Sequence, residues 1–195
     1  MKRPVAILLF DDIEVLDFAG PFEVFTAADE LRQGTAFATY TVAETAGEIR
    51  CHNGLRVVPD YTFATCPPAE VLVVPGGFGT RALLQRPAAV EWLRDRAQQA
   101  GIVMSVCTGA LVLARAGLLG GLRVTTHYEA LDLLRALEPR AIIDRGARFH
   151  DNGKILTAAG VSAGIDCALH VVARLLSPAA AEETARYIEY ERREN

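Results

Sequence analysis

The chain has 195 residues, of which 51% are hydrophobic and 23% charged, and its formal net charge at pH 7 is −4. This length and composition predict one globular domain over residues 1–195, and the small negative charge argues against a nucleic-acid or anionic-membrane partner. No apolar stretch approaches the ~20 residues of a transmembrane helix, and we expect no signal peptide.

The four cysteines lie far apart in the sequence and form no C-x-x-C pair. Such spacing argues against a zinc site or a disulfide framework and favours a reducing compartment. We therefore expect a cytoplasmic protein that holds no metal ion and no cofactor. The cysteines are Cys51, Cys66, Cys107 and Cys167.

Strand and helix patterns alternate along the chain. The first helix is expected to run to about Leu31 with Pro21 in its first turn, where the missing N–H costs nothing. Asn-Gly pairs at 53–54 and 152–153 each predict a hairpin, and Ser162 is a candidate N-cap. Expected strands and hairpins cover residues 4–10, 36–43, 48–59, 70–75, 101–106, 124–127 and 149–159. Expected helices cover residues 21–31, 87–100, 108–117, 128–137 and 163–176, with a final helix from 178 towards 195.

This alternation predicts an α/β fold with a mostly parallel sheet and helices on both faces. Ligands of such open sheets bind at the carboxyl ends of the strands, near a topological switch point. Asp17, the pair Gly76 and Gly77, and Cys107 follow different predicted strands. We therefore expect these residues to converge at one edge of the sheet.

Cys107 has the strongest functional signal in the chain. It lies between the apolar run 101–106 and a helix pattern, where backbone N–H groups lack intrahelical partners and the helix dipole is positive. That position favours the thiolate, which is the nucleophilic form of cysteine. The opposing interpretation is an inert buried cysteine, and the strand–Cys–Thr–Gly–helix context favours the nucleophile.

A nucleophilic cysteine needs a proton partner and, in acyl-type chemistry, donors for developing negative charge. Asp17 is the nearest acid by topology; a thiolate beside it would raise its pKa and let it act as a general acid. A carboxylate that stabilises a helix N-terminus is the alternative for Asp17. The N–H groups of Gly77, Thr108 and Gly109 are candidate donors, and Gly76 permits a close backbone approach.

His127 follows a short predicted strand and is a candidate base for a Cys–His pair. The alternative is a histidine that packs near the site without taking part in chemistry. Thr108 directly follows the nucleophile, so no adjacent histidine base is available there.

The chain resembles the ThiJ/PfpI superfamily of class I glutamine-amidotransferase-like domains over nearly its full length. The segments that carry the resemblance are LLFDDIEVLDFAGPFEVF, VLVVPGGFG, SVCTGALVLARAGLLGGLRVTTHYEAL and AAGVSAGIDCALHVVA. Within the superfamily, LDFAGP, VCTGALVLARAGLL and TTHY are most similar to the isocyanide hydratases. The same segments also occur in the sensory domains of some AraC-type transcription regulators.

The resemblance implies a flavodoxin-like three-layer sandwich, a nucleophile elbow and a homodimer that acts on a small molecule. Carried over from the hydratases, Cys107 attacks the isonitrile carbon and Asp17 is its carboxyl partner and proton donor. Thr108 shapes the site, and Gly77 offers backbone donors. A thioimidate would form, and water would release an N-formamide.

Departures from the superfamily patterns bear on the activity. Thr108 stands where the peptidase-like members have a histidine, and Asp17 where the human parkinsonism-linked branch and its glyoxalase relatives have a glutamate. Residues 158–161 (AAGV) replace a glycine run of the hydratases, so a different pocket floor is expected. The regulators carry a further DNA-binding module that this sequence does not show, which disfavours a regulator.

Two alternatives to the hydratase remain. One is another cysteine reaction on a small electrophile, since glyoxalase, deglycase, amidase or peptidase activity would use the same nucleophile. The other is a redox stress-response or sensor protein in which an accessible Cys107 is oxidised reversibly.

Overall fold

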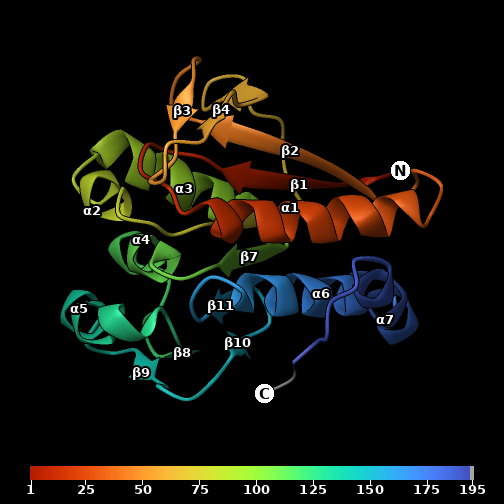
Figure 1. Cartoon of the computed structure of the whole chain (residues 1–195). Helices are drawn as coiled ribbons and strands as arrows, with labels where there is room; N and C mark the ends of the chain where they lie inside the picture. The colour runs from red at the N-terminus through yellow and green to blue at the C-terminus, as the bar shows by residue number, and fades with distance from the viewer. Residues whose placement is uncertain (194–195) are drawn as a thin grey trace.

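Seven strands form the main sheet of the protein, whose computed structural model describes residues 1–193 (Figure 1). They are β1 (Arg3–Leu8), β2 (Phe37–Ala43), β5 (Tyr61–Thr62), β6 (Val71–Val74), β7 (Ile102–Ser105), β10 (Phe149–Asp151) and β11 (Ile155–Ala158). Their order is β10-β11-β7-β6-β1-β2-β5, and every neighbouring pair is parallel except β10–β11. Two small sheets pair β3 (Ile49–Arg50) with β4 (Arg56–Val57) and β8 (Arg123–Val124) with β9 (Ile142–Ile143).

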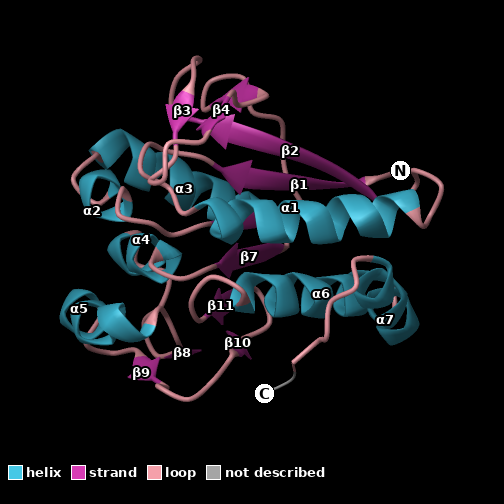
Figure 2. Ribbon diagram, viewed as in Figure 1, coloured by secondary structure: helices cyan, strands magenta, loops and turns pink. Residues whose placement is uncertain are grey.

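Helices cover both faces of this sheet (Figure 2). They are α1 (Val15–Glu30), α2 (Thr80–Leu83), α3 (Pro87–Gln99), α4 (Gly109–Arg115), the 3₁₀ helix η1 (Tyr128–Ala130), α5 (Leu131–Leu137), α6 (Ala163–Leu175) and α7 (Pro178–Tyr187). Helices α1, α6 and α7 pack against one another, and α4 packs against α2, α3 and α5. The protein therefore has the predicted flavodoxin-like three-layer α/β fold.

The strand order explains the two helical layers. The chain passes from β1 through α1 to β2 in one direction, and from β6 through α3 to β7 in the other. Since such crossovers are right-handed, α1 and α3 lie on opposite faces of the sheet. The direction reverses between β1 and β6, and that switch point is where open α/β sheets place their ligands.

The central strands are largely apolar because both of their faces are covered. All four residues of β6 and all four of β7 are buried, as are the last four of β1. A continuous apolar run is the pattern that parallel strands covered on both sides require. These strands therefore form a rigid base for the loops that follow their carboxyl ends.

The first helix begins earlier than the sequence pattern predicted. Helix α1 starts at Val15, so Asp17 lies in its first turn and Pro21 is inside the helix rather than at its start. The missing N–H of Pro21 leaves the carbonyl of Asp17 without its usual i→i−4 bond. The Gly20-Pro21 pair is typical of a boundary, and burial against α6 overrides that local preference.

Other elements also differ in detail from the prediction. Ser162 occupies the N-cap position of α6, but its Oγ accepts a hydrogen bond from Arg148 and makes no side-chain cap. The expected helix 128–137 is divided into η1 and α5, and the short elements α2, β5 and β9 were not predicted. Both Asn-Gly hairpins are confirmed, as β3–β4 and β10–β11. The predicted final helix ends at Tyr187, so its expected continuation through 188–193 is wrong, and 194–195 lie outside the described residues.

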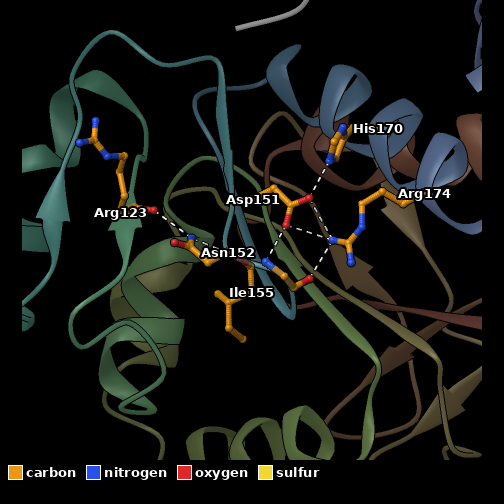
Figure 3. A network of polar contacts seen from close by, with 7 residues as sticks. Arg123, Asp151, Asn152, Ile155, His170 and Arg174 are labelled. Carbon is orange, nitrogen blue, oxygen red and sulfur yellow. Dashed lines mark hydrogen bonds and ion pairs between the residues drawn. The ribbon is translucent and has the colours of Figure 1, made fainter.

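The β10–β11 hairpin is joined to α6 through Asp151 (Figure 3). Its Oδ2 lies 2.7 Å from Nε2 of His170, and Nη1 of Arg174 lies 3.0 and 3.1 Å from its two oxygens. The same Nη1 donates to the carbonyl of Gly153 at 2.7 Å. Burial raises the pKa of Asp151, but its hydrogen bonds to His170 and Gly153 and the charge of Arg174 outweigh this, so the pKa is lowered.

We expect Asp151→Asn to lower the free energy of unfolding by about 1–2 kcal/mol at pH 7. Because the folded-state pKa is depressed, this contribution is present above the unfolded-state pKa of about 3.9 and is lost as the pH falls through the folded value. Urea unfolding at pH 7 and at about pH 3 checks this. Asp132→Asn, whose side chain is 83% exposed, is the control and should change little. Equal effects of the two substitutions at pH 7 would contradict the prediction.

Trp92 on α3 stacks on Phe63, which follows β5. The ring centroids are 4.1 Å apart with an interplanar angle of 9°, and the indole Nε1 donates to the Phe63 carbonyl at 3.3 Å. The stack packs α3 against the edge of the sheet.

No helix within residues 1–193 is long and apolar enough to cross a bilayer.

Candidate active site

Cys107 lies on a sharp turn between β7 and α4. Its φ is +55°, a left-handed conformation that is costly for a residue with a Cβ and is found most often at functional sites. Its N–H donates to the Ala159 carbonyl at 2.8 Å, and its carbonyl accepts from Oγ1 of Thr126 at 2.7 Å. Both backbone groups are thus held by neighbouring loops, which maintains the predicted elbow.

Gly76, at the end of β6, permits the approach of Asp17 and the elbow. A Cβ at this position would lie 2.5 Å from the backbone N of Thr108 and 2.9 Å from Oδ2 of Asp17. Any other residue would push one of these groups away. The structure therefore brings Asp17, Gly76 and Cys107 together at the carboxyl edge of the sheet, as the sequence predicted.

Asp17 is fully buried beneath the elbow. Its Oδ2 accepts the N–H of Gly76 at 2.9 Å, whereas no hydrogen bond within residues 1–193 reaches Oδ1. Burial raises the pKa of Asp17 to about 7, against the lowering effect of the Gly76 N–H, and the negative charge of Glu14 adds to the rise. Asp17 can therefore gain and lose a proton near neutral pH.

The Cys107 thiol has a raised pKa, contrary to the thiolate predicted from its position. Burial and the charge of Asp17 raise the pKa to about 12, although hydrogen bonds from the N–H groups of Thr108 and Val161 lower it. Removing a thiol from water and placing it beside a carboxylate outweighs the helix N-terminus. Near neutral pH the thiol stays protonated, and Asp17, once it has lost its own proton, is placed to accept the proton of the sulfur.

The backbone N–H groups of three glycines predicted to take part in substrate binding already have partners in the structure. The N–H of Gly76 binds Asp17, that of Gly77 donates to Oγ1 of Thr108 at 2.9 Å, and that of Gly109 donates to the Val106 carbonyl at 2.9 Å. Substrate binding by Gly76, Gly77 and Gly109 therefore stays a prediction. Their backbone groups hold the carboxyl and the elbow in place.

Thr108 connects the two loops of the site. Its hydroxyl lies 3.1 Å from the Gly77 carbonyl as well as 2.9 Å from the Gly77 N, and Oγ1 of Thr80 is 3.2 Å away. A histidine at position 108 would replace this compact set of contacts. Thr108 therefore joins the elbow to the loop that follows β6.

A cavity of about 130 Å³ opens onto the thiol. Phe78 and Arg81 form part of its wall, with the guanidinium of Arg81 5.6 Å from the centroid of the Phe78 ring. Asp17 is fully buried next to Cys107 and is not one of the lining residues. The lining residues are Glu14, Gly77, Phe78, Arg81, Cys107, Thr108, His127, Glu129, Ala130 and Val161.

His127 lines the same cavity as Cys107, but its observed bonds are local. Its Nδ1 accepts the N–H of Glu129 at 3.4 Å and lies 3.8 Å from Oε2 of that residue. Its Cδ2 packs so closely on Gly160 that a Cβ there would lie 2.5 Å from it. This geometry favours the interpretation of His127 as a packed wall residue over that of a base for Cys107.

Two residues that the sequence analysis did not single out act on the reacting pair. Glu14 lines the cavity and raises the pKa of Asp17, and Val161 donates its N–H to the thiol. Glu14 is the N-cap residue of α1, three positions before Asp17, and this short spacing was a usable signal. Val161 acts through its backbone, and its side-chain type gave no indication of that role.

The described residues contain no group of three or more His, Cys, Asp or Glu side chains placed to hold a metal ion. A thiol, a carboxyl of near-neutral pKa and a small cavity suit addition to a compact electrophile.

Comparison with known proteins finds relatives of this chain over most of its length. A sequence model of the DJ-1/PfpI family matches residues 3–174. An isonitrile hydratase of Pseudomonas putida is 35% identical over 97% of this chain and 79% of its own length. A ThiJ/PfpI family protein from Pseudomonas syringae superposes with a TM-score of 0.88 at 33% identity, over 99% of this chain and 77% of that one. The transcriptional regulator GbdR of Pseudomonas aeruginosa is 27% identical over 88% of this chain, which spans 46% of the regulator.

Proposed function

The chain belongs to the DJ-1/PfpI family, and we propose that it is a cysteine-dependent hydratase that converts small isonitriles to N-formamides. The observation that carries the proposal is the buried Asp17 carboxyl against a Cys107 thiol that opens onto a small cavity. The 35% identity with an isonitrile hydratase supports the choice of substrate class.

The first step would form the bond between sulfur and carbon. Cys107 attacks the terminal isonitrile carbon while its proton passes to Asp17, and Asp17 then returns that proton to the same carbon. The product is a thioimidate, in which the carbon is bonded to sulfur and hydrogen and doubly bonded to nitrogen. The pKa of about 7 suits Asp17 for both halves of this transfer.

The second step would consume one water molecule. Water adds to the thioimidate carbon, and one of its protons passes to nitrogen to give a tetrahedral intermediate. Collapse of that intermediate breaks the carbon–sulfur bond and returns a proton to Cys107. The N-formamide leaves, and the enzyme regains its starting protonation state.

We expect purified protein to convert cyclohexyl isocyanide to N-cyclohexylformamide. Chromatography and mass spectrometry measure the formation of this product. Cys107→Ala should abolish this turnover, because no other residue that lines the cavity carries a thiol. Cys51→Ala is the matched control, since Cys51 is also a free buried cysteine and does not line the cavity. Absence of formamide, or turnover that survives Cys107→Ala, would overturn the proposal.

The same protein should be offered methylglyoxal, a glycated amine and a peptide amide, which test the other cysteine reactions. Cys107-dependent turnover of one of these, without isonitrile hydration, would replace the hydratase by that activity. Mass spectrometry after mild peroxide tests the sensor alternative. Selective oxygen addition at Cys107 with no turnover of any substrate would favour it.

We also propose that the protein is a cytoplasmic homodimer, as the family resemblance suggests. Light scattering on the eluting peak of a size-exclusion column tests the dimer. A mass near the 21.1 kDa of one chain would overturn it.

A further inference from the structure

The loop of residues 159–162, between β11 and α6, contacts the nucleophile at two points. The Ala159 carbonyl accepts the N–H of Cys107 at 2.8 Å, and the N–H of Val161 hydrogen-bonds the Cys107 sulfur. Val161 has a φ of +48°, a conformation unfavourable for a β-branched residue. Such a conformation persists only where surrounding contacts determine it, so the loop must be held from outside.

Arg148 holds this loop at both of its ends. Its backbone carbonyl accepts the N–H of Ala159 at 3.0 Å, which fixes the start of the loop. Its guanidinium donates to Oγ of Ser162 at 2.9 Å, which fixes the end, and to Oδ2 of Asp166 at 2.6 Å on the first turn of α6. One residue thus spans the short segment that carries the Val161 N–H.

The segment after α7 completes the arrangement around Asp166, which is fully buried. The hydroxyl of Tyr190 accepts from Nη2 of Arg148 at 3.3 Å and donates to Oδ2 of Asp166 at 3.1 Å. The backbone N–H of Arg193 donates to Oδ1 of Asp166 at 2.8 Å. Both carboxylate oxygens are therefore bonded, and the guanidinium has one well-defined position.

We propose that Arg148 is a positioning residue for the nucleophile: it fixes both ends of the 159–162 loop and so keeps the Val161 N–H directed at the Cys107 sulfur. The guanidinium does not line the cavity, so it acts through the loop rather than on the substrate. The inference rests on the proposed role of Cys107 as the nucleophile, but not on the identity of the substrate.

The test measures alkylation of Cys107 by iodoacetamide as a function of pH, with the modified residue identified by mass spectrometry. Only the thiolate reacts, so loss of a hydrogen bond to sulfur lowers the rate at each pH below the thiol pKa. We expect Arg148→Met to lower the rate about tenfold, equivalent to a displacement of the pH–rate line by about one unit. Arg148→Lys, which keeps the positive charge and can keep part of these side-chain bonds, should recover part of the loss.

Ser162→Ala is the second variant, because it releases the end of the loop without changing any charge or breaking the Arg148–Asp166 pair. We expect this variant to lower the alkylation rate of Cys107 about threefold. Arg174→Met is the matched control: this arginine also joins α6 to the β10–β11 hairpin, through Asp151, and lies away from the loop (Figure 3). It should leave the rate unchanged even where it lowers the melting temperature.

The outcomes separate positioning from general stability. A slower reaction in Arg148→Met and Ser162→Ala, but not in Arg174→Met, supports the proposal. Rates equal to that of the unmodified protein, equal slowing by Arg174→Met, or no reaction of Cys107 in any form overturns it. Since alkylation requires no isonitrile, failure of the hydratase assay and failure of this test are distinct results.

Discussion

Asp17→Asn is expected to reduce isonitrile turnover about 10³-fold while making the folded protein more stable at pH 7 and above. Asparagine can keep the hydrogen bond from the Gly76 N–H, but it cannot accept the proton of Cys107. General acid–base catalysis contributes about 10²–10⁴-fold, and Asp17 is the group placed for it. Steady-state rates of the two proteins check the loss.

The gain in stability follows from the sign of the Asp17 pKa shift. The pKa of the folded state is about 7, above the unfolded value of about 3.9. Between these values the folded protein binds the proton and the unfolded chain does not, so stability falls as the pH rises. Asparagine does not titrate. The difference in free energy of unfolding between Asp17→Asn and the wild type should therefore be absent below about pH 4 and reach a few kcal/mol in favour of the variant above pH 7.

The pH dependence of turnover gives a further readout of the same residue. The reactive Cys107–Asp17 pair carries one proton, so kcat/KM should rise with pH through about 7 as Asp17 loses its proton in the resting enzyme. This limb should vanish in Asp17→Asn. An Asn variant that keeps the limb, or that is less stable than the wild type at pH 8, would contradict the assignment.

Gly109→Ala is expected to prevent the elbow from forming and to lower the free energy of unfolding by about 3 kcal/mol or more. A Cβ at Gly109 would overlap the Val74 carbonyl oxygen and lie 2.9 Å from that of Pro75. Both atoms are backbone at the end of β6, and neither can move without displacing the sheet. Urea unfolding measures the loss.

Gly101→Ala serves as the matched control for that substitution. The atom that its Cβ would meet first, the Glu70 carbonyl oxygen, is 3.5 Å away, which is an ordinary contact. Its effect should lie within about 0.5 kcal/mol of zero. A Gly109→Ala protein as stable as Gly101→Ala would show that the elbow tolerates a side chain.

The sheet and the elbow were predictable because their signals are local and repeated. The apolar runs of β1, β6 and β7 and the two Asn-Gly turns each indicate an element without reference to the rest of the chain. The start of α1 was not predictable. The Gly20-Pro21 pair indicates a helix boundary locally, and only tertiary packing overrides this local preference.

The site was predictable in its membership but not in its electrostatics. Cys107 and Asp17 could be placed together from topology, since each follows a strand of one sheet. Their pKa values depend on burial and on mutual contact, which are properties of the folded protein. Two hydrogen bonds join parts of the chain that are distant in sequence: the Gly77 N–H donates to Thr108, and Arg148 donates to Ser162. No local sequence pattern indicates either bond.

The stacking of Trp92 on Phe63 has a practical consequence for all of these measurements. Trp92 is the single tryptophan of the chain, and it lies on α3 rather than in the cavity wall. Its emission should therefore report the loss of tertiary packing without interference from what occupies the cavity. The protein carries an internal optical probe of folding that is separate from its chemistry, so each variant can be tested for both in one sample.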